Sequence, residues 1–214
     1  MMIQGYDKIY LDKIMTLLAD MFDYAVNDCH YSIDQVTKYF ITSQIYKEIE
    51  IANPYYIGRS GAELLKLIIE KQIHREIYVK PHIQIQKSPE YWCGYVAAYY
   101  QWVSQKSFKQ IFEVISASEI VNMYDPLHEA DIQKFVDVMN EIFEKHYQPT
   151  YLQQMRKAQG LSQSQLALKS GVSLRVIQAY EQREKNINKA SVTNMKKLAD
   201  TLHCYIEDLI EEKL

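Results

Sequence analysis

Apolar residues recur three or four positions apart along most of the chain, the spacing that places them on one face of an α-helix. The series that show this most clearly are Leu11, Ile14, Leu18 and Phe22, then Leu64, Leu65, Ile68 and Ile69, and then Phe135, Val138, Met139 and Ile142. Helix starts are also marked, because Ser60 with Glu63 and Ser162 with Gln165 fit the capping-box pattern. The pattern therefore predicts a mainly all-α protein.

One segment departs from the helical spacing. Its apolar residues alternate with other residues on either side of Pro81, the period that is typical of a β-strand. The alternating positions are Ile77, Val79, Ile83 and Ile85. A short extended stretch or β-hairpin is therefore expected within residues 77–86.

A boundary between two domains is expected near Pro149, because the residue before a proline is biased away from helix. The 214 residues are enough for two domains with hydrophobic cores. Residues 147–214 contain ten Lys and Arg against seven Asp and Glu, whereas residues 1–146 contain fourteen against twenty. The excess of positive charge in the second domain points to a nucleic-acid partner, although the whole chain has a net charge of −3.

The most informative string runs from Leu161 to Arg183 and reads LSQSQLALKSGVSLRVIQAYEQR. Ala167 is small enough for a second helix to cross closely, and Gly171 suits a left-handed backbone in a tight turn. The apolar contacts expected between the two helices come from Leu166, Val172, Ile177 and Tyr180. This spacing of small, glycine and aliphatic positions predicts a helix-turn-helix.

The string also resembles the Cro/C1-type (XRE-like) family of bacterial and phage regulators. The similarity covers residues 151–211, with the LSQ opening, the A-x-x-S-G-V-S turn, the I-x-x-Y-E close and a later K-x-L-A-x-x-L helix. It implies a five-helix, lambda-repressor-like domain that binds double-stranded DNA, with the helix at residues 174–182 in the major groove. Residues 147–214 are therefore interpreted as a DNA-binding domain.

The resemblance also implies roles for individual residues. The positions that match base-reading positions are Leu174, Arg175, Gln178 and Ala179. Arginine suits guanine and glutamine suits adenine, whereas Leu174 departs from the polar residue that is common there. Phosphate contacts are expected from Ser162, Gln163, Ser173, Arg183, Lys185 and Lys189. A structural ion pair is expected between Arg156 and Glu181, and residues 182–188 replace a glycine that is common in the family.

Aromatic residues are the notable feature of residues 1–146. A stripe at helical spacing consists of Tyr91, Tyr95, Tyr99 and Trp102. Such a stripe is either part of the core or a surface that binds a partner, because Tyr and Trp are favoured at buried interfaces. Both interpretations remain open from the sequence.

Catalytic chemistry is not indicated. Asp28, Cys29 and His30 are residue types that bind metals or act as nucleophiles, but no spaced partners complete a site. We expect no catalytic residue, metal or cofactor, and the chain is not expected to be an enzyme. There is no apolar run of membrane-spanning length, the start of the chain does not resemble a secretion signal, and the three cysteines do not suggest a disulfide framework. A cytoplasmic protein that does not enter membranes is expected.

The strings MFDYAVNDC, ANPYYIGRSGAEL and YWCGYVAAYYQW are similar to an uncharacterised helical region of Firmicute-type regulators and antitoxins. That similarity implies a protein partner for residues 1–146. The first hypothesis is a homodimeric transcriptional regulator, a repressor, whose first domain serves dimerisation or ligand sensing. The alternative is an antitoxin whose first domain binds a small toxin-like protein and whose second domain autoregulates the operon.

Overall fold

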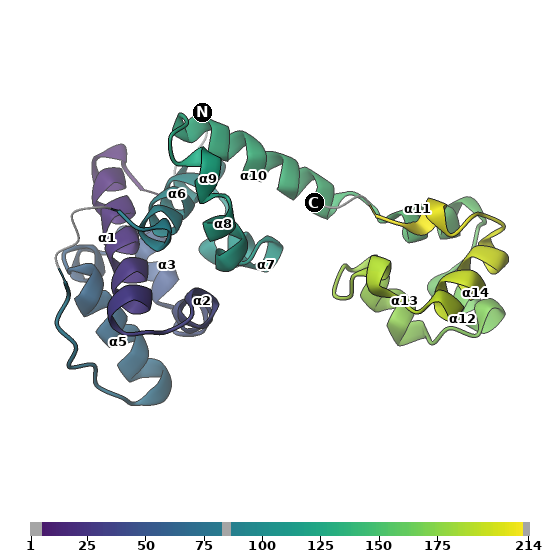
Figure 1. Ribbon diagram of the computed structural model, residues 1–214, viewed down its shortest axis with the longest axis horizontal. Helices are drawn as coiled ribbons and strands as arrows, with labels where there is room; N and C mark the ends of the chain where they lie inside the picture. Colours follow the sequence, from purple (N-terminus) through teal and green to yellow (C-terminus); the bar gives the residue numbers. More distant parts are fainter. Residues whose placement is uncertain (1–5, 83–86, 212–214) are drawn as a thin grey trace. The chain divides into compact units, whose positions relative to one another are not determined.

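The computed structural model describes residues 6–82 and 87–211, and these residues form helices and loops without any strand (Figure 1). The prediction of a mainly all-α protein is therefore confirmed. The chain divides into two compact units, Met1–Asn140 and Glu141–Leu214. Among the helices that the structure describes, none has both the length and the apolar character needed to cross a membrane.

The N-terminal unit is a bundle of short helices with 3-10 and π-helical turns. Its elements are η1 (Lys8–Tyr10), α1 (Leu11–Asp23), the π-helical η2 (Tyr24–Asp28), α2 (Ile33–Thr42), α3 (Ile45–Glu50), α4 (Pro54–Ile57), α5 (Gly61–Ile73), α6 (Pro89–Ser104), α7 (Phe108–Val114), α8 (Ala117–Asn122) and α9 (Tyr124–Leu127). Helix α10 (Ile132–Tyr147) follows and continues into the C-terminal unit.

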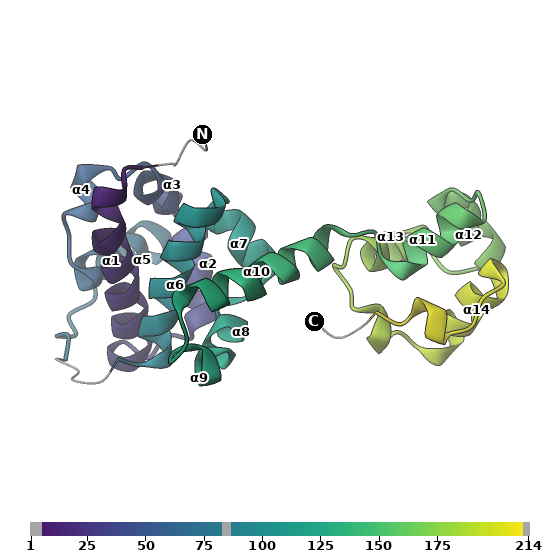
Figure 2. The ribbon, with the colours of Figure 1, turned by 90° about the horizontal axis from the view of Figure 1, so that it is seen from above.

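Helix α1 packs against both α6 and α5 in the N-terminal unit (Figures 1 and 2). Glycines on both neighbouring helices let their backbones approach it closely. A Cβ atom at Gly94 of α6 would lie 2.4 Å from the Leu18 carbonyl oxygen, and one at Gly61 would lie 2.4 Å from the Met21 nitrogen. Contacts this short leave no space for any side chain, so the packing of α1 requires glycine at both positions.

The predicted core positions of the first two helical series are all buried in the structure: Leu11, Ile14, Leu18, Phe22, Leu64, Leu65, Ile68 and Ile69. In the third series, Phe135 and Met139 are buried, whereas Val138 and Ile142 are partly exposed. The capping boxes at the starts of α5 and of residues 163–170 are both present, as predicted.

The hairpin expected within residues 77–86 is not formed by residues 77–82, and residues 83–86 lie outside the described part of the chain. Two contacts hold this segment against η2 instead of a partner strand. The Tyr24 hydroxyl donates to the Val79 carbonyl oxygen at 2.6 Å, and the His82 backbone N–H donates to the Asp28 carboxylate at 3.2 Å. Pro81 has no N–H with which to extend a strand ladder.

The C-terminal unit is built from α11 (Tyr151–Ala158), α12 (Gln163–Ser170), α13 (Leu174–Glu181), η3 (Ile187–Lys189), α14 (Val192–Leu202) and η4 (Glu207–Leu209). The fifth helix that the family resemblance implies is thus the short 3-10 turn η4. The core of the C-terminal unit contains Leu152, Leu166, Val172, Ile177, Tyr180, Ile187, Met195, Leu198, Ala199, Leu202 and Leu209. The four apolar contacts predicted for the helix-turn-helix are all in this core, so that prediction is confirmed.

Candidate nucleic-acid interface

The turn between α12 and α13 is closed by local hydrogen bonds. Gly171 has a φ of +68°, and its N–H donates to the Ala167 carbonyl oxygen at 2.9 Å. The Ser170 hydroxyl donates to the Leu166 carbonyl oxygen at 2.7 Å and accepts the Val172 N–H at 3.2 Å. These bonds satisfy the end of α12 and return the chain to the core at Val172, which is the geometry of a helix-turn-helix.

Helix α13 has one buried and one exposed face. Arg175 is exposed and Gln178 is half-buried, and neither side chain has a hydrogen bond or ion pair to another described residue. Leu174 is 36% exposed at the start of the helix. These three side chains therefore remain available to a ligand. Ala179 is only 6% exposed, so it offers little surface to a base.

The serines that precede α12 and α13 differ in their hydrogen bonds. The Ser162 hydroxyl accepts the Gln165 N–H at 3.1 Å and so caps α12. Ser173 stands at the same place before α13, but its hydroxyl makes no capping bond. Gln163 donates one amide proton to Glu181 at 2.9 Å, which leaves its second amide N–H for another acceptor.

Arg156 of α11 and Glu181 at the end of α13 form a buried, bidentate ion pair. The Nε and Nη2 atoms of Arg156 donate to the two carboxylate oxygens at 2.6 and 2.8 Å. The two side chains are only 9% and 1% exposed. Arg156 also donates to the Leu161 carbonyl oxygen at 2.7 Å, and its bond to Glu181 raises the pKa of the guanidinium above its ordinary value. The residues expected to pair are thus in contact, and Gln163 and the Leu161 carbonyl join them.

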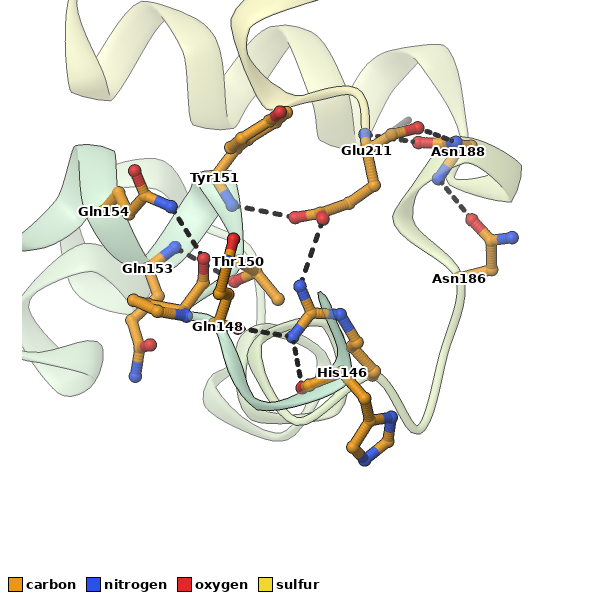
Figure 3. A network of polar contacts seen from close by, with 11 residues as sticks. His146, Gln148, Thr150, Tyr151, Gln153, Gln154, Asn186, Asn188 and Glu211 are labelled. Carbon is orange, nitrogen blue, oxygen red and sulfur yellow. Dashed lines mark hydrogen bonds and ion pairs between the residues drawn. The ribbon is translucent and has the colours of Figure 1, made fainter. Parts of the chain in front are cut away.

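The sequence predicts a phosphate contact for Arg183, but in the structure its guanidinium bonds other residues of the C-terminal unit. Its Nη1 atom donates to the carbonyl oxygens of His146 and Gln148 at 2.9 and 2.7 Å (Figure 3). Its Nη2 atom pairs with a Glu211 carboxylate oxygen at 3.2 Å. Burial and the nearby Arg183 charge lower the pKa of His146. The guanidinium therefore already has three partners within the C-terminal unit.

Two lysines that follow Arg183 have side chains exposed to solvent. Lys185 and Lys189 are exposed, and neither ammonium group forms an ion pair with another described residue. Between them, Ile187 is only 4% exposed and anchors the loop in the core. The loop at residues 182–188 is therefore anchored by a buried aliphatic side chain, while Lys185 remains exposed.

The aromatic stripe of α6 is partly buried in the N-terminal unit. Tyr91 and Tyr95 stack with a centroid separation of 6.4 Å, and Tyr99 and Trp102 are tilted at 6.5 Å. All four side chains are half-buried. The face of α6 that packs into the core is a different one and carries Gly94, Ala97, Ala98 and Tyr100. The stripe thus retains exposed aromatic surface.

Three of the four charged side chains that line one hollow of the N-terminal unit are engaged in contacts with neighbouring residues. A hollow of about 250 Å³ between α2, α7 and α8 contains two carboxylates and two ammonium groups. Of these, Asp34 accepts the Ser118 N–H at 3.0 Å, and Lys109 pairs with Glu113 at 3.7 Å.

The carboxylate of Asp28 contacts the ring of His82, a pairing that the sequence analysis missed. Burial raises the pKa of the adjacent Cys29 thiol, which disfavours the reactive thiolate. Within residues 6–82 and 87–211, no three His, Cys, Asp or Glu side chains are grouped so that they could hold a metal ion.

Comparison with known proteins adds one finding. Residues 152–209 match the helix-turn-helix family model, and this range runs from α11 to η4. No curated protein and no solved structure shows significant similarity to the chain. The match supports the resemblance noted for the C-terminal part, whereas the similarity noted for residues 1–146 receives no support, because the match begins at residue 152.

Proposed function

We propose that this chain is a sequence-specific repressor that uses its C-terminal helix-turn-helix domain to bind operator DNA. A helix-turn-helix domain is a DNA-binding module of transcription regulators, and its second helix lies in the major groove. The observation that carries the proposal is the exposed face of α13, where Arg175 and Gln178 stand unpaired above a closed core. We further propose that the bound protein would exclude RNA polymerase from an overlapping promoter and so repress transcription.

The chemistry of this face suits base edges. Arg175 can donate two hydrogen bonds to the O6 and N7 atoms of guanine, and Gln178 can pair with the N6 and N7 atoms of adenine. Leu174 can contact a thymine methyl group. We leave Ala179 out of the base-reading set because it is buried.

Phosphate contacts are proposed at both ends of the motif and in the following loop. The Ser173 hydroxyl and the second amide N–H of Gln163 lie near helix N-termini, where backbone N–H groups and the helix dipole favour anions. Ser162 is placed in the same set, although its hydroxyl already caps α12. Lys185 and Lys189 would add salt-dependent contacts further along the backbone.

We propose that the chain acts as a homodimer. A dimer places two recognition helices about 34–36 Å apart, one turn of DNA, and so reads a palindromic site. No catalytic activity and no cofactor are assigned to either unit.

Replacing Arg175 with Ala is expected to relax base preference at one position of each half-site. A good bidentate pair contributes roughly 1–3 kcal/mol of discrimination, so the preference for one base should fall by a factor of about five or more. The measurement is selection of duplexes from a random library by the wild-type and variant proteins. Lys196→Ala, which removes an exposed charge from α14, is the matched control. An unchanged base preference in the Arg175 variant would remove this residue from the base-reading set.

The second candidate function is that of an antitoxin that binds a small toxin-like protein. The observation that favours it is the aromatic stripe of α6, since half-exposed Tyr and Trp side chains are common at protein interfaces. In a pull-down from the native host, Tyr91→Ala and Tyr99→Ala should each reduce recovery of one small partner encoded nearby. Tyr78→Ala, at an 83% exposed tyrosine outside the stripe, should leave recovery unchanged. Recovery of the chain alone would argue against this candidate.

A further inference from the structure

The C-terminal end of α10 is capped by a residue from the loop that follows α13. The last carbonyl groups of a helix have no partner within the helix and are commonly satisfied by cationic side chains. Here Arg183 supplies that partner, because one of its nitrogens donates to the carbonyl oxygens of His146 and Gln148 at 2.9 and 2.7 Å. Arg183 stands two residues after the end of α13 and has a φ of +57°, in the left-handed region that residues other than glycine seldom adopt.

Glu211, the last residue that the structure describes, completes the arrangement (Figure 3). One carboxylate oxygen pairs with Arg183 at 3.2 Å, and the other accepts the Tyr151 N–H at 2.8 Å in the first turn of α11. Its backbone N–H and carbonyl oxygen bond the side chain of Asn188 at 2.9 and 2.7 Å. The carboxylate therefore caps α11, while the backbone of Glu211 fastens η3.

These contacts fix both ends of the loop between α13 and α14. Arg183 holds its beginning and Asn188 holds its end, and the two exposed lysines, Lys185 and Lys189, lie between or directly beside these anchors. The Arg183 and Glu211 side chains are 22% and 23% exposed, so their pairing is partly shielded from water. A charged pair of this kind is screened less by salt than one on the open surface.

We propose that Arg183 and Glu211 form a clasp that positions the loop lysines for contact with the DNA backbone. This inference rests on the proposed DNA-binding function. Arg183 is then a positioning residue that binds no phosphate, and Glu211 promotes DNA binding although it is an anion.

The sign of the Glu211 effect distinguishes the clasp from simple electrostatics. Removing a negative charge from a DNA-binding domain favours binding to a polyanion when only long-range charge matters. If the clasp positions the loop, the same change weakens binding, because the lysines lose their fixed geometry. A matched control is Glu207, an exposed acidic residue in the same C-terminal segment whose carboxylate has no hydrogen bond or ion pair to the described residues.

The experiment uses the full chain and a duplex that the wild-type protein selects from a random library. Affinity is measured at several salt concentrations for Glu211→Gln, Arg183→Ala, the double variant and Glu207→Gln. Amide hydrogen exchange of Tyr151, Lys185 and Asn188 is followed in the same proteins without DNA. Circular dichroism establishes that each variant remains folded at the assay temperature.

The clasp predicts that Glu211→Gln and Arg183→Ala each raise Kd about fivefold or more, while Glu207→Gln does not. The double variant should be no weaker than the weaker single variant, because both changes open one clasp. The salt slope should fall in both single variants, by up to about 0.9 for each lysine–phosphate contact that is lost. Exchange of the three amides should become faster in both single variants.

The proposal is overturned if Glu211→Gln binds as tightly as Glu207→Gln. It is also overturned if Arg183→Ala weakens binding and lowers the salt slope by about 0.9, while Glu211→Gln keeps the wild-type affinity and slope, because Arg183 would then contact a phosphate itself. If the wild-type protein selects no duplex, the proposed DNA-binding function is rejected, but the clasp is still tested. Hydrogen exchange then decides the clasp: faster exchange confined to these amides supports it, and unchanged exchange rejects it.

Discussion

Replacing Glu181 with Ala is expected to lower the free energy of unfolding of the C-terminal unit by about 3–5 kcal/mol. The substitution leaves the Arg156 guanidinium, whose side chain is 9% exposed, without its bidentate counter-charge. A buried charge without a partner costs far more than the pair contributes, because desolvation is no longer offset. Gln163 loses its acceptor at the same time. Urea unfolding followed by circular dichroism measures the change.

Glu184→Ala is the control for this experiment, because Glu184 is an exposed acidic residue in the following loop. Exposed charges of this kind change stability by less than about 1 kcal/mol. At low temperature, where the Glu181 variant is still folded, its base preference should match that of the wild-type protein. A shift in base preference without loss of stability would show that the pair acts in recognition and would contradict its structural role.

Replacing Gly94 with Ala is expected to lower the stability of the N-terminal unit by about 3 kcal/mol, the upper end of the usual range for overpacking. The added methyl group would meet the Leu18 carbonyl oxygen at 2.4 Å, and backbone atoms cannot move aside as a flexible side chain can. Helix α6 must therefore shift away from α1.

The sign of this change separates packing from helix propensity. In a helix that has space around it, Gly→Ala stabilises by roughly 0.5–1 kcal/mol, because alanine loses less backbone entropy on folding. Thermal unfolding of the wild-type and Gly94→Ala proteins should therefore show a lower Tm for the variant. A higher Tm would mean that α1 and α6 do not pack as closely as the structure shows.

Local signals explain why much of the C-terminal unit could be predicted from the sequence. The capping box at Ser162, the turn at Gly171 and the buried contacts of Leu166 and Ile177 depend on residues that are close in the chain. Such short-range patterns constrain backbone geometry directly. The helical class of the N-terminal unit follows for the same reason, because apolar spacing reports which face of a helix is buried.

Contacts between distant residues could not be predicted in this way. Arg183 has the charge and the sequence position expected of a phosphate ligand. Its partners in the structure, such as His146 and Glu211, lie 28 to 37 residues away in the chain. Ala179 lies on the same helix as Arg175, and only packing of the whole domain shows that it is buried.

The N-terminal unit gives two further examples. The core-facing side of α6 is determined by the close approach of Gly94 to α1, so the more conspicuous aromatic stripe is only half-buried. The expected hairpin is replaced within residues 77–82 by contacts of Val79 and His82 with η2, whose residues lie more than 50 positions earlier. An alternating pattern indicates extended backbone, but it does not identify the partner.

The central claim is that the exposed face of α13 reads specific DNA sequences. The most direct test is selection by the full wild-type chain from a library of random duplexes, followed by affinity measurements on the enriched sequence at several salt concentrations. The account predicts enrichment of a palindrome with half-sites about one DNA turn apart and binding at least about 10³ times tighter than to unrelated duplexes. Equal, weak binding to all duplexes, without any enriched sequence, would contradict it.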